Sequence, residues 1–365
     1  MAASGSPLVL LAAGGTGGHL FPAEALAVVL DKRGITVDLA TDHRAAHFKF
    51  PAHTVHLISS ATLRGRDPIS LVRTATLLTL GTAKAWVLLG RIKPNAVVGF
   101  GGYPTVPPLV AASWRGVPTV LHEQNGVMGR ANRLLAPRVT AIATGFRTLK
   151  NFNRHWQSKI TFTGNPLRPQ VIAAAATPYA ALADGKLHLL VFGGSQGAHV
   201  MAAVVPQAIE RLNTDLLGRL SIVQQARAED LDAVRATYAR LGVRAEIAPF
   251  FRDLPARMAA SQLVISRSGA SSVAELSAIG RPAILVPLPH ALDQDQLANA
   301  GVLEAAGGAI LIEQWDFTPE RLAKEIGALA KDPVRLAQMA QAARSAGTTD
   351  AAERLADLVI KVARI

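Results

Sequence analysis

The sequence predicts an α/β protein of two domains, each built on a doubly wound parallel sheet. Apolar runs of about four to seven residues alternate with helix-length segments along nearly the whole chain, which is the pattern of βαβ units with helices on both faces of the sheet. The chain has 365 residues, of which 50% are hydrophobic, so each half can bury a core of its own. Two glycine-rich turns, at 14–18 and 193–197, occupy equivalent places in the two halves.

The expected strands coincide with the short apolar runs. In chain order the clearest runs are residues 8–13, 35–40, 96–100, 119–121, 160–162, 187–192, 263–265 and 283–286. Helices are expected between them. Residues 351–363 have apolar positions at helical spacing, and we expect this last helix, within a C-terminal segment of about 345–365, to pack back on the first domain.

The segment 164–169, with the sequence GNPLRP, is the best candidate for a linker between the domains. Its two prolines, together with the turn residues Gly164 and Asn165, favour a break between compact units. We therefore expect an N-terminal domain over residues 1–165 and a C-terminal domain over residues 166–344.

The composition excludes several kinds of site and segment. The chain has no cysteine, so it forms no disulfide and no thiolate metal site. The N-terminus has no basic region ahead of its apolar run, and glycine loops interrupt the long uncharged stretches. We therefore expect neither a signal peptide nor a membrane-spanning helix.

Positive charge is concentrated in the first half of the chain. The formal net charge is +12, and residues 1–165 contain 18 Lys or Arg against 6 Asp or Glu, whereas residues 166–365 contain 20 of each. Such a one-sided excess points to an anionic partner, which could be a membrane surface, a nucleic acid or a phosphorylated substrate. Nucleic acid is disfavoured, because aromatic residues make up only 5% of the chain and no compact basic run is interleaved with them.

Each glycine turn follows an apolar strand and opens a helix. The sequences are GGTGGH at 14–19 and GGSQGA at 193–198. The first N–H groups of a helix lack internal partners and lie at the positive end of its dipole, so a bare glycine loop there can approach an anion such as a diphosphate closely. Ligands bind outside the carboxyl ends of parallel strands, and two such sheets facing each other would form a cleft lined by both loops.

Two Rossmann-like domains facing across a cleft form the GT-B architecture of many nucleotide-sugar glycosyltransferases and a few epimerases. Further motifs are GGYPT at 101–105, HEQN at 122–125, SRSGA at 266–270 and DQDQ at 293–296, followed by Asn299 and Ala300. Together with the two glycine loops, these motifs resemble those of the MurG family of bacterial glycosyltransferases (glycosyltransferase family 28) and come in the same order along the chain. The resemblance extends from about residue 8 to about residue 345. The resemblance implies inverting transfer of N-acetylglucosamine from UDP-GlcNAc to lipid I, the undecaprenyl-pyrophosphoryl-MurNAc-pentapeptide, which gives lipid II for peptidoglycan synthesis.

The resemblance implies that the second domain binds the donor, UDP-GlcNAc. The diphosphate would lie at a helix start on Gly269, Ala270, Ser271 and Ser272, where either serine could cap the helix. Glu275 would accept hydrogen bonds from the ribose hydroxyls, and the backbone of Phe251 would read the uracil edge. Gln296, or Asp295 beside it, would bind the GlcNAc hydroxyls. The remaining expected donor-binding residues are Thr16, Gly17, Gly18, Asn125, Arg168, Ser195 and Gln196.

The first domain is expected to hold the acceptor. His19, at the end of the first glycine loop, is a candidate base that takes the proton from the C4 hydroxyl of MurNAc, and Glu123 is the alternative base or a residue that orients the base. Gly14, Tyr103 and Thr105 are expected on the acceptor side. Thr105 and Val106 stand where family members often have serine and glycine, so this chain keeps the hydroxyl group and lacks the glycine.

No metal or other cofactor is expected. The triplet DQD at 293–295 resembles the Asp-x-Asp that holds a divalent ion in the other large glycosyltransferase fold. In this chain helix termini and Arg168 can stabilise the departing diphosphate without a metal. The histidines at 43, 47, 53 and 56 could be a metal cluster, yet no carboxylate accompanies them at a fixed spacing, so we interpret them as surface residues.

A lipid acceptor implies contact with a bilayer, and residues 63–93 have the composition of an interfacial segment. Cations near such a surface attract anionic phospholipid with about 1 kcal/mol each, beside apolar side chains that enter the interface. The apolar residues are Ile69, Leu71, Leu77, Leu78, Leu80, Trp86 and Leu88, and the cations are Arg64, Arg66, Arg73, Lys84, Arg91 and Lys93. We therefore expect a peripheral protein on the cytoplasmic face of the bacterial inner membrane, with proteins of cell-wall and division complexes as further partners.

Three alternative functions are open. An epimerase on the same fold would bind UDP-GlcNAc and release UDP without a lipid acceptor. An NAD-dependent oxidoreductase would use the first glycine loop and Asp38, although this loop does not match the G-x-G-x-x-G pattern. A peripheral membrane scaffold would keep the fold without turnover, and the polar residues retained on both sides of the expected cleft argue against it.

Overall fold

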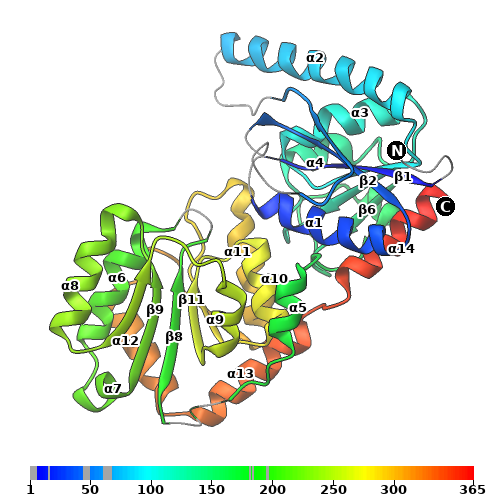
Figure 1. Ribbon diagram of the computed structural model, residues 1–365. Helices are drawn as coiled ribbons and strands as arrows, with labels where there is room; N and C mark the ends of the chain where they lie inside the picture. The colour runs from blue at the N-terminus through cyan, green and yellow to red at the C-terminus, as the bar shows by residue number, and fades with distance from the viewer. Residues whose placement is uncertain are drawn as a thin grey trace. The chain divides into compact units, whose positions relative to one another are not determined.

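The computed structural model describes residues 6–14, 17–43, 50–60, 68–180, 182, 185–194 and 197–365, with the backbone alone for 68–71 and Leu292. The chain divides into two compact units. The first contains Met1–Arg168 and Thr349–Ile365, and the second contains Pro169–Thr348. Each unit is an α/β domain with its own parallel sheet (Figure 1).

The sheet of the first unit has seven parallel strands in the order β3-β2-β1-β4-β5-β6-β7. The strands are β1 (Leu8–Ala12), β2 (Thr36–Thr41), β3 (Thr54–Leu57), β4 (Ala96–Gly99), β5 (Thr119–Glu123), β6 (Ala141–Thr144) and β7 (Ile160–Phe162). The helices are α1 (Gly17–Lys32), α2 (Pro68–Ile92), α3 (Val106–Trp114), α4 (Arg130–Leu135) and α14 (Ala351–Ala363), with short 3-10 turns at Tyr103–Thr105 and Arg154–Lys159.

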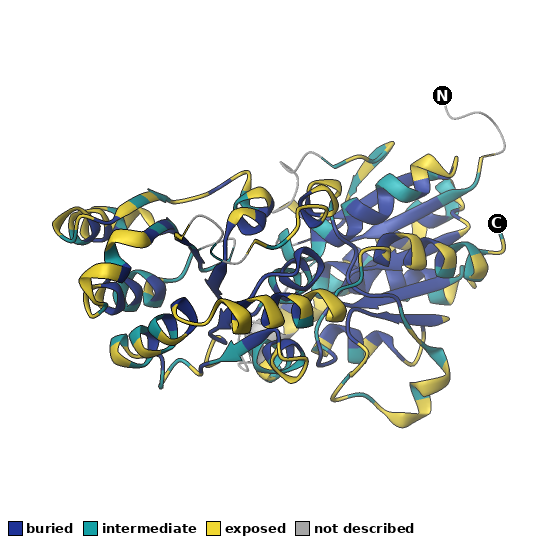
Figure 2. Ribbon diagram, turned by 90° about the horizontal axis from the view of Figure 1, so that it is seen from below, coloured by how far each residue is buried: buried dark blue, intermediate teal, exposed yellow. Residues whose placement is uncertain are grey.

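Alternate residues of a strand face opposite sides of its sheet, and in the first unit both sides are apolar. Val9 and Leu11 of β1 belong to a core cluster that also contains α1 and α14 residues. Leu10 and Ala12 belong to a second cluster with residues of α2, α3 and α4. The strands are accordingly buried, while the outer faces of the helices are exposed (Figure 2).

The C-terminal helix α14 is part of the first unit. It lies beside α1 and contacts β4, β5 and β6 (Figure 1). Leu355, Ala356 and Val359 are fully buried in the cluster with α1, and Arg33 of α1 donates a hydrogen bond to Asp357 at 2.6 Å. The chain thus returns to the first unit after completing the second.

The sheet of the second unit has six parallel strands in the order β10-β9-β8-β11-β12-β13. The strands are β8 (Leu187–Phe192), β9 (Leu220–Gln225), β10 (Arg244–Ala248), β11 (Leu263–Ser266), β12 (Ala283–Leu285) and β13 (Ala309–Leu311). The helices are α5 (Pro169–Ala175), α6 (His199–Glu210), α7 (Thr214–Arg219), α8 (Leu231–Arg240), α9 (Leu254–Ala260), α10 (Ala270–Ile279), α11 (Asp295–Ala305), α12 (Pro319–Ala330) and α13 (Pro333–Ala346), with 3-10 turns at Ala228–Asp230 and Leu292–Gln294.

The expected α/β class with two parallel sheets is confirmed. Strands β7 and β8 and helix α14 have the expected bounds, and β5 continues two residues beyond the apolar run, to Glu123. The chain passes from the first unit to the second after Arg168 and returns after Thr348, a few residues later than the boundaries expected from the sequence. Because of this shift, Arg168 lies in the first unit.

Candidate functional site

The first glycine loop joins β1 to α1 in the first unit. Gly14 ends the described part of the loop, Thr16 lies outside the described residues, and α1 begins at Gly17, so Gly17, Gly18 and His19 form its first turn. A Cβ at Gly14 would lie 3.1 Å from Pro104 and 3.2 Å from Thr41 Oγ1. A side chain at this position would therefore displace Pro104 or Thr41 by a few tenths of an ångström, because both segments approach the loop closely.

His19 is held by a hydrogen bond to a buried glutamine. Its Nδ1 lies 2.9 Å from Oε1 of Gln124, and Nε2 of Gln124 donates to the carbonyl oxygen of Phe100 at 2.9 Å. Gly101 and Gly102 cover the opposite edge of the imidazole. A Cβ at Gly102 would lie 3.4 Å from His19 Nε2, and a Cβ at Gly101 would lie 3.5 Å from His19 Cε1.

Both oxygens of the buried Glu123 carboxylate accept hydrogen bonds from the loop that follows β5. Oε1 accepts from the backbone N–H of Asn125 at 2.9 Å and from its side-chain amide at 3.3 Å. Oε2 accepts from the N–H of Gly129 at 2.9 Å and from Nδ2 of Asn132 at 2.7 Å. Burial raises the pKa of Glu123, and these four donors act in the opposite direction. The carboxylate thus organises residues 125–132.

Tyr103 and Thr105 lie in the 3-10 turn between β4 and α3. Thr105 is fully buried, and its hydroxyl donates to the carbonyl oxygen of Gly102 at 2.8 Å. The hydroxyl therefore stabilises the turn that contacts His19. Val106 begins α3 and is buried in the core.

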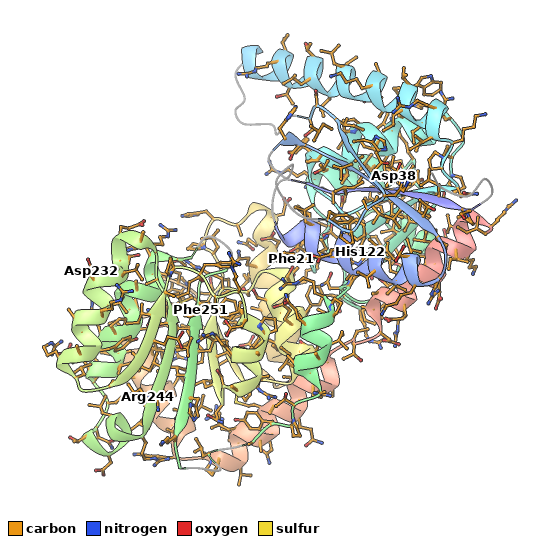
Figure 3. All side chains as sticks on the ribbon, in the orientation of Figure 1. Phe21, Asp38, His122, Asp232, Arg244 and Phe251 are labelled. Carbon is orange, nitrogen blue, oxygen red and sulfur yellow. The ribbon has the colours of Figure 1, made fainter. Side chains whose placement is uncertain are left out.

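Arg168 packs on the first helix of its own unit. Its guanidinium carbon lies 3.9 Å from the ring centroid of Phe21, which is labelled in Figure 3. Phe21 follows His19 by two residues on α1. Burial raises the pKa of Glu24, one turn further along, and the positive charge of Arg168 lowers it. The arginine that precedes the second unit is therefore fixed against the helix that carries His19.

The second glycine loop joins β8 to α6 in the second unit. Ser195 and Gln196 lie outside the described residues. Gly193 donates its N–H to Oε1 of Gln225 at 3.0 Å, and a Cβ at Gly193 would lie 2.2 Å from the backbone nitrogen of Ala198. Gly194 has a φ of 89° and Gly197 has a φ of 70°, conformations that favour glycine.

The turn between β11 and α10 presents a helix N-terminus. Gly269 is the N-cap residue, and Ala270, Ser271 and Ser272 form the first turn. The expectation that Ser271 or Ser272 caps this helix is wrong, because the helix starts before both of them and no side chain caps it. Its first N–H groups retain the character of an anion site.

Arg267 fixes the strand ends around this turn. Its side chain is largely buried and donates to the carbonyl oxygens of Val286 and Pro287 at 3.1 and 2.9 Å, and to Oε1 of Gln314. Burial lowers the pKa of the guanidinium. The loops after β11, β12 and β13 are thereby tied together at the carboxyl edge of the sheet.

Phe251, Glu275 and Gln296 also lie in the second unit, whereas the expected donor residues Gly17, Gly18, Asn125 and Arg168 lie in the first. Glu275 is buried in the second turn of α10. The Phe251 ring is buried under Arg257, whose guanidinium carbon is 4.4 Å from the ring centroid, so recognition by Phe251 would fall to its backbone (Figure 3).

Gln296 lies at the start of α11, where its Oε1 accepts from the N–H of Leu288 at 3.1 Å. Asp295 Oδ1 accepts from the N–H of Gln296 at 2.7 Å, and burial raises the pKa of Asp295. Asp293 and Gln294, just before the helix, have φ values of 58° and 55°. Left-handed conformations at two consecutive residues with side chains cost energy and are concentrated at functional sites.

The interpretation of the four histidines as surface residues is wrong for His56. Its side chain is only 12% exposed, and its Nε2 lies 2.9 Å from the buried Asp38 carboxylate. His53 is half exposed beside the same carboxylate, His43 is exposed, and His47 lies outside the described residues. In the described part of the chain no three His, Asp or Glu side chains are arranged to hold a metal ion.

The outer face of α2 exposes apolar side chains. Val72, Leu80 and Val87 are 66%, 54% and 71% exposed, and their spacing of eight and seven residues places them on one face. Leu78 and Leu88, in contrast, pack against the core. Trp86 is 39% exposed, and the guanidinium of Arg115 lies over its ring at 4.5 Å. We call Val72, Leu80, Trp86 and Val87 the α2 apolar face.

The expected membrane segment, residues 63–93, begins outside the described residues. Leu63, Arg64 and Arg66 lie outside the described residues, and the side chains of Ile69 and Leu71 are not described. No helix in the described part of the chain is long and apolar enough to cross a membrane.

Family models match the two halves of the chain separately. Residues 9–144 match the glycosyltransferase family 28 N-terminal domain, and residues 188–355 match the glycosyltransferase family 28 C-terminal domain. The UDP-N-acetylglucosamine–N-acetylmuramyl-(pentapeptide) pyrophosphoryl-undecaprenol N-acetylglucosamine transferase of Rhodopseudomonas palustris is 62% identical over 363 residues, which cover 99% of each chain. The chain belongs to the MurG branch of glycosyltransferase family 28.

Solved structures extend the MurG relationship to the fold. MurG of Acinetobacter baumannii has a TM-score of 0.78 and 28% identity, covering 97% of this chain and 99% of that one. The UDP-GlcNAc 2-epimerase of Neisseria meningitidis bound to UDP-GlcNAc has a TM-score of 0.65 and 15% identity, covering 97% of this chain and all of that one. The second likeness is one of fold alone. The GT-B class expected from the sequence is confirmed.

Membership of the MurG branch argues against the oxidoreductase alternative, and so does the position of Asp38. This residue lies in the middle of β2 and is buried (Figure 3). One oxygen accepts from the N–H of Thr54 at 3.1 Å, and the other contacts His56. Asp38 therefore stabilises the pairing of β2 with β3, where a cofactor ribose would need an accessible carboxylate.

Several residues that organise the MurG-like site had no role assigned from the sequence. Gln124 and Arg267 were quoted within motifs, but their partners lie far along the chain. Gln225 of the second unit resembles Gln124 of the first, because both are buried glutamines. Gln225 binds Gly193 of the second glycine loop, and Gln124 binds His19 of the helix that follows the first loop. Their signal in the sequence is a glutamine at the carboxyl end of an apolar strand.

Proposed function

We propose that this chain transfers N-acetylglucosamine from UDP-GlcNAc to the C4 hydroxyl of MurNAc in lipid I, forming lipid II. The observation that carries this proposal is the 62% identity to a relative named for that transfer, across 99% of both chains. The proposed donor and acceptor residues are those of the motifs that this chain shares with the family.

The second unit would bind the donor. The uncapped start of α10 offers N–H groups for the diphosphate, and the buried Glu275 in the next turn offers a carboxylate for the ribose hydroxyls. The Phe251 backbone would bind the uracil, and Gln296 at the start of α11 would bind the GlcNAc hydroxyls. Ser195 and Gln196 of the second glycine loop complete the proposed donor set.

The first unit would bind the acceptor beside Gly14, Tyr103 and Thr105. His19 Nε2 would take the proton of the C4 hydroxyl while the oxygen attacks the anomeric carbon and the bond to the UDP oxygen breaks. Attack from the side opposite the leaving group inverts α to β in one displacement, without a covalent enzyme intermediate. Glu123 is the weaker candidate for the base, because both of its oxygens are occupied by loop donors.

Departure of UDP leaves negative charge on the diphosphate. Helix N-termini and the guanidinium of Arg168 are groups that stabilise such charge as it develops. Thr16, Gly17, Gly18 and Asn125 belong to the same proposed set. We propose that these groups serve in place of a divalent ion, so that transfer requires no metal.

The α2 apolar face would bring the protein to its lipid acceptor. The same helix also exposes Arg73, Lys84 and Arg91, so α2 combines apolar side chains with cations suited to an anionic phospholipid surface. We therefore propose that the protein is peripheral on the cytoplasmic face of the inner membrane. We also propose proteins of cell-wall synthesis and division as its partners there.

The decisive experiment measures transfer of labelled GlcNAc from UDP-GlcNAc by the purified protein, with and without a short-chain lipid I analogue, in the presence of EDTA. Transfer that requires the analogue supports the proposed function and its independence of metal. Release of UDP or formation of an epimer without the analogue would support the epimerase alternative instead. Absence of both reactions would favour the scaffold.

A further inference from the structure

We propose that Gln124 is a positioning residue that holds His19 in the tautomer with a proton on Nδ1, so that Nε2 carries the lone pair needed to accept a proton. The expected effect of Gln124 on turnover rests on the proposed function. The tautomer itself is a property of the free protein and can be observed without substrate.

The orientation of the Gln124 amide follows from its second partner. One of the two terminal atoms of the amide lies 2.9 Å from the carbonyl oxygen of Phe100, and a carbonyl oxygen can only accept a hydrogen bond. The NH2 group must therefore face Phe100, which leaves Oε1 facing His19 Nδ1 at 2.9 Å. Because Oε1 has no proton to give, Nδ1 must be the donor. The lone pair of the neutral ring then lies on Nε2.

Gln124 cannot easily turn over, because the strand end around it is fixed. The residue is buried, and its own carbonyl oxygen accepts from Nδ2 of Asn165 at 3.0 Å. The neighbouring His122 donates from Nε2 to the carbonyl oxygen of Gly164 at 3.0 Å. Two side chains thus join the end of β5 to the segment 164–165, and the amide between them retains one orientation.

The imidazole ring is also confined on the edge that bears Nε2. Gly101 and Gly102 approach it with φ values of 83° and 72°, which only glycine adopts readily. Asn132, which lies within 3.5 Å of a Cβ built on Gly101, is itself held by Glu123. The ring therefore has little freedom to exchange the positions of its two nitrogens. Glu123 supports the same geometry through Asn132.

Gln124 would also stabilise the product of proton transfer. When Nε2 takes the hydroxyl proton, the imidazolium retains the Nδ1–H bond to Oε1, and the amide dipole places negative partial charge beside the new cation. A ring without this acceptor would favour the Nε2–H tautomer, as an isolated imidazole side chain does, and could not accept a proton at that nitrogen.

The test compares Gln124→Met, which removes the acceptor, with Gln124→Glu, which keeps an oxygen facing Nδ1 in either protonation state. Proton-coupled 15N spectra of histidine-labelled, ligand-free protein, with His19→Gln used for assignment, report the tautomer. We expect the Nδ1–H form in the wild type and Gln124→Glu and the Nε2–H form in Gln124→Met. We also expect kcat to fall by roughly 10–100-fold in Gln124→Met, with KM for UDP-GlcNAc unchanged, which is less than the about 10²–10⁴-fold contribution of a general base.

Gln207→Met is the matched control, because Gln207 is an exposed residue of α6 whose amide donates to the carbonyl oxygen of Ala203 within the same helix. It should leave the spectrum and kcat unchanged. The inference is overturned if the wild type shows the Nε2–H form, if Gln124→Met keeps the Nδ1–H form, or if both Gln124 variants lose the same kcat. An inactive wild type with the Nδ1–H form would refute the proposed function and leave the tautomer assignment standing.

Discussion

The buried His122 makes the stability of the first unit depend on pH. Its side chain is 0% exposed, and burial lowers its pKa from 6.5 to about 4, against the smaller effect of its bond to Gly164. The unfolded chain binds a proton below pH 6.5, whereas the folded chain does so only near pH 4. The stability that this group contributes is therefore complete above pH 6.5 and is lost as the pH falls toward 4.

We expect the free energy of unfolding of the wild type to fall between pH 6.5 and pH 4 by up to about 3 kcal/mol more than that of His122→Gln. Urea titrations followed by tryptophan fluorescence measure this difference, because Trp86, Trp114 and Trp156 all lie in the first unit. The variant retains an amide donor for the carbonyl oxygen of Gly164. Parallel pH dependences for the two proteins would show that His122 is not buried in its neutral form.

Replacing Glu123 should lower the stability of the protein, whereas replacing His19 should lower its kcat. Because the Glu123 carboxylate accepts four hydrogen bonds, Glu123→Gln would turn an amide NH2 toward N–H donors. We expect a loss of about 1–3 kcal/mol in stability, because a buried donor loses its partner, and a corresponding fall in Tm. His19→Gln, in contrast, should abolish most of kcat with little change in Tm. An inactive Glu123→Gln with unchanged Tm would instead identify Glu123 as the base.

At the scale of secondary-structure elements, α2 serves two environments along its 25 residues. Thr74, Gly81, Ala85 and Leu89 are buried, and a Cβ at Gly81 would lie 2.1 Å from the carbonyl oxygen of Ser59. The opposite side carries the α2 apolar face. The apolar residues of this segment are therefore divided between the core and the surface, a division that the sequence pattern alone could not provide.

Replacing Val72 and Val87 together by Glu should weaken binding to vesicles of anionic phospholipid by roughly 10–100-fold, since burying each side chain in the interface is worth about 1.5 kcal/mol. Co-sedimentation with vesicles measures the change. Val334→Glu is the matched control, because Val334 is 65% exposed on α13 of the second unit and should not affect binding. Equal binding of all three proteins would exclude the α2 apolar face as the membrane contact.

The sequence predicted strands by the continuity of their apolar runs and not by their place in the sheet, because the edge strand β7 has the expected bounds whereas the central strands β6 and β9 were not among the expected runs. Strand β8 has the expected bounds because all of its residues except His188 are apolar and buried. Strands β3 and β10 lie at sheet edges, where Val55 and Leu57 are exposed and polar residues alternate with apolar ones. Short segments in which polar and apolar residues alternate cannot be distinguished from loops in the sequence, because they form strands only through hydrogen bonds to a neighbouring strand.

The candidate site shows the same limit. Motifs placed His19 and Glu123 in the first unit, and Glu275 and Gln296 in the second, because their neighbours along the chain form recognisable loops. The roles of Gln124 and Arg267 depend on partners 105 and 47 residues away. Such contacts exist only in the folded structure. For the same reason the buried pair of Asp38 and His56 could not be distinguished from surface residues.

At the scale of the whole molecule, most of the proposed donor-binding residues fall in the second unit and the proposed acceptor-side residues fall in the first. The chain crosses to the second unit after Arg168 and returns with α14, so the two units are joined by two short connections. A ligand that binds one native unit stabilises that unit by RT ln(1 + [L]/Kd) and slows the exchange of its amide hydrogens. The assignment can therefore be tested without turnover.

We expect saturating UDP-GlcNAc to slow amide hydrogen exchange at residues 250–252, 269–276 and 294–299 of the second unit. Mass spectrometry of peptic peptides resolves these segments from β8, whose core amides should change little. Glu275→Ala should remove most of the protection, because the ribose would lose its carboxylate partner, while Asp232→Ala, at a fully exposed residue of α8 in the same unit, is the control. Protection confined to residues 97–132 of the first unit would reverse the assignment of donor and acceptor to the two units.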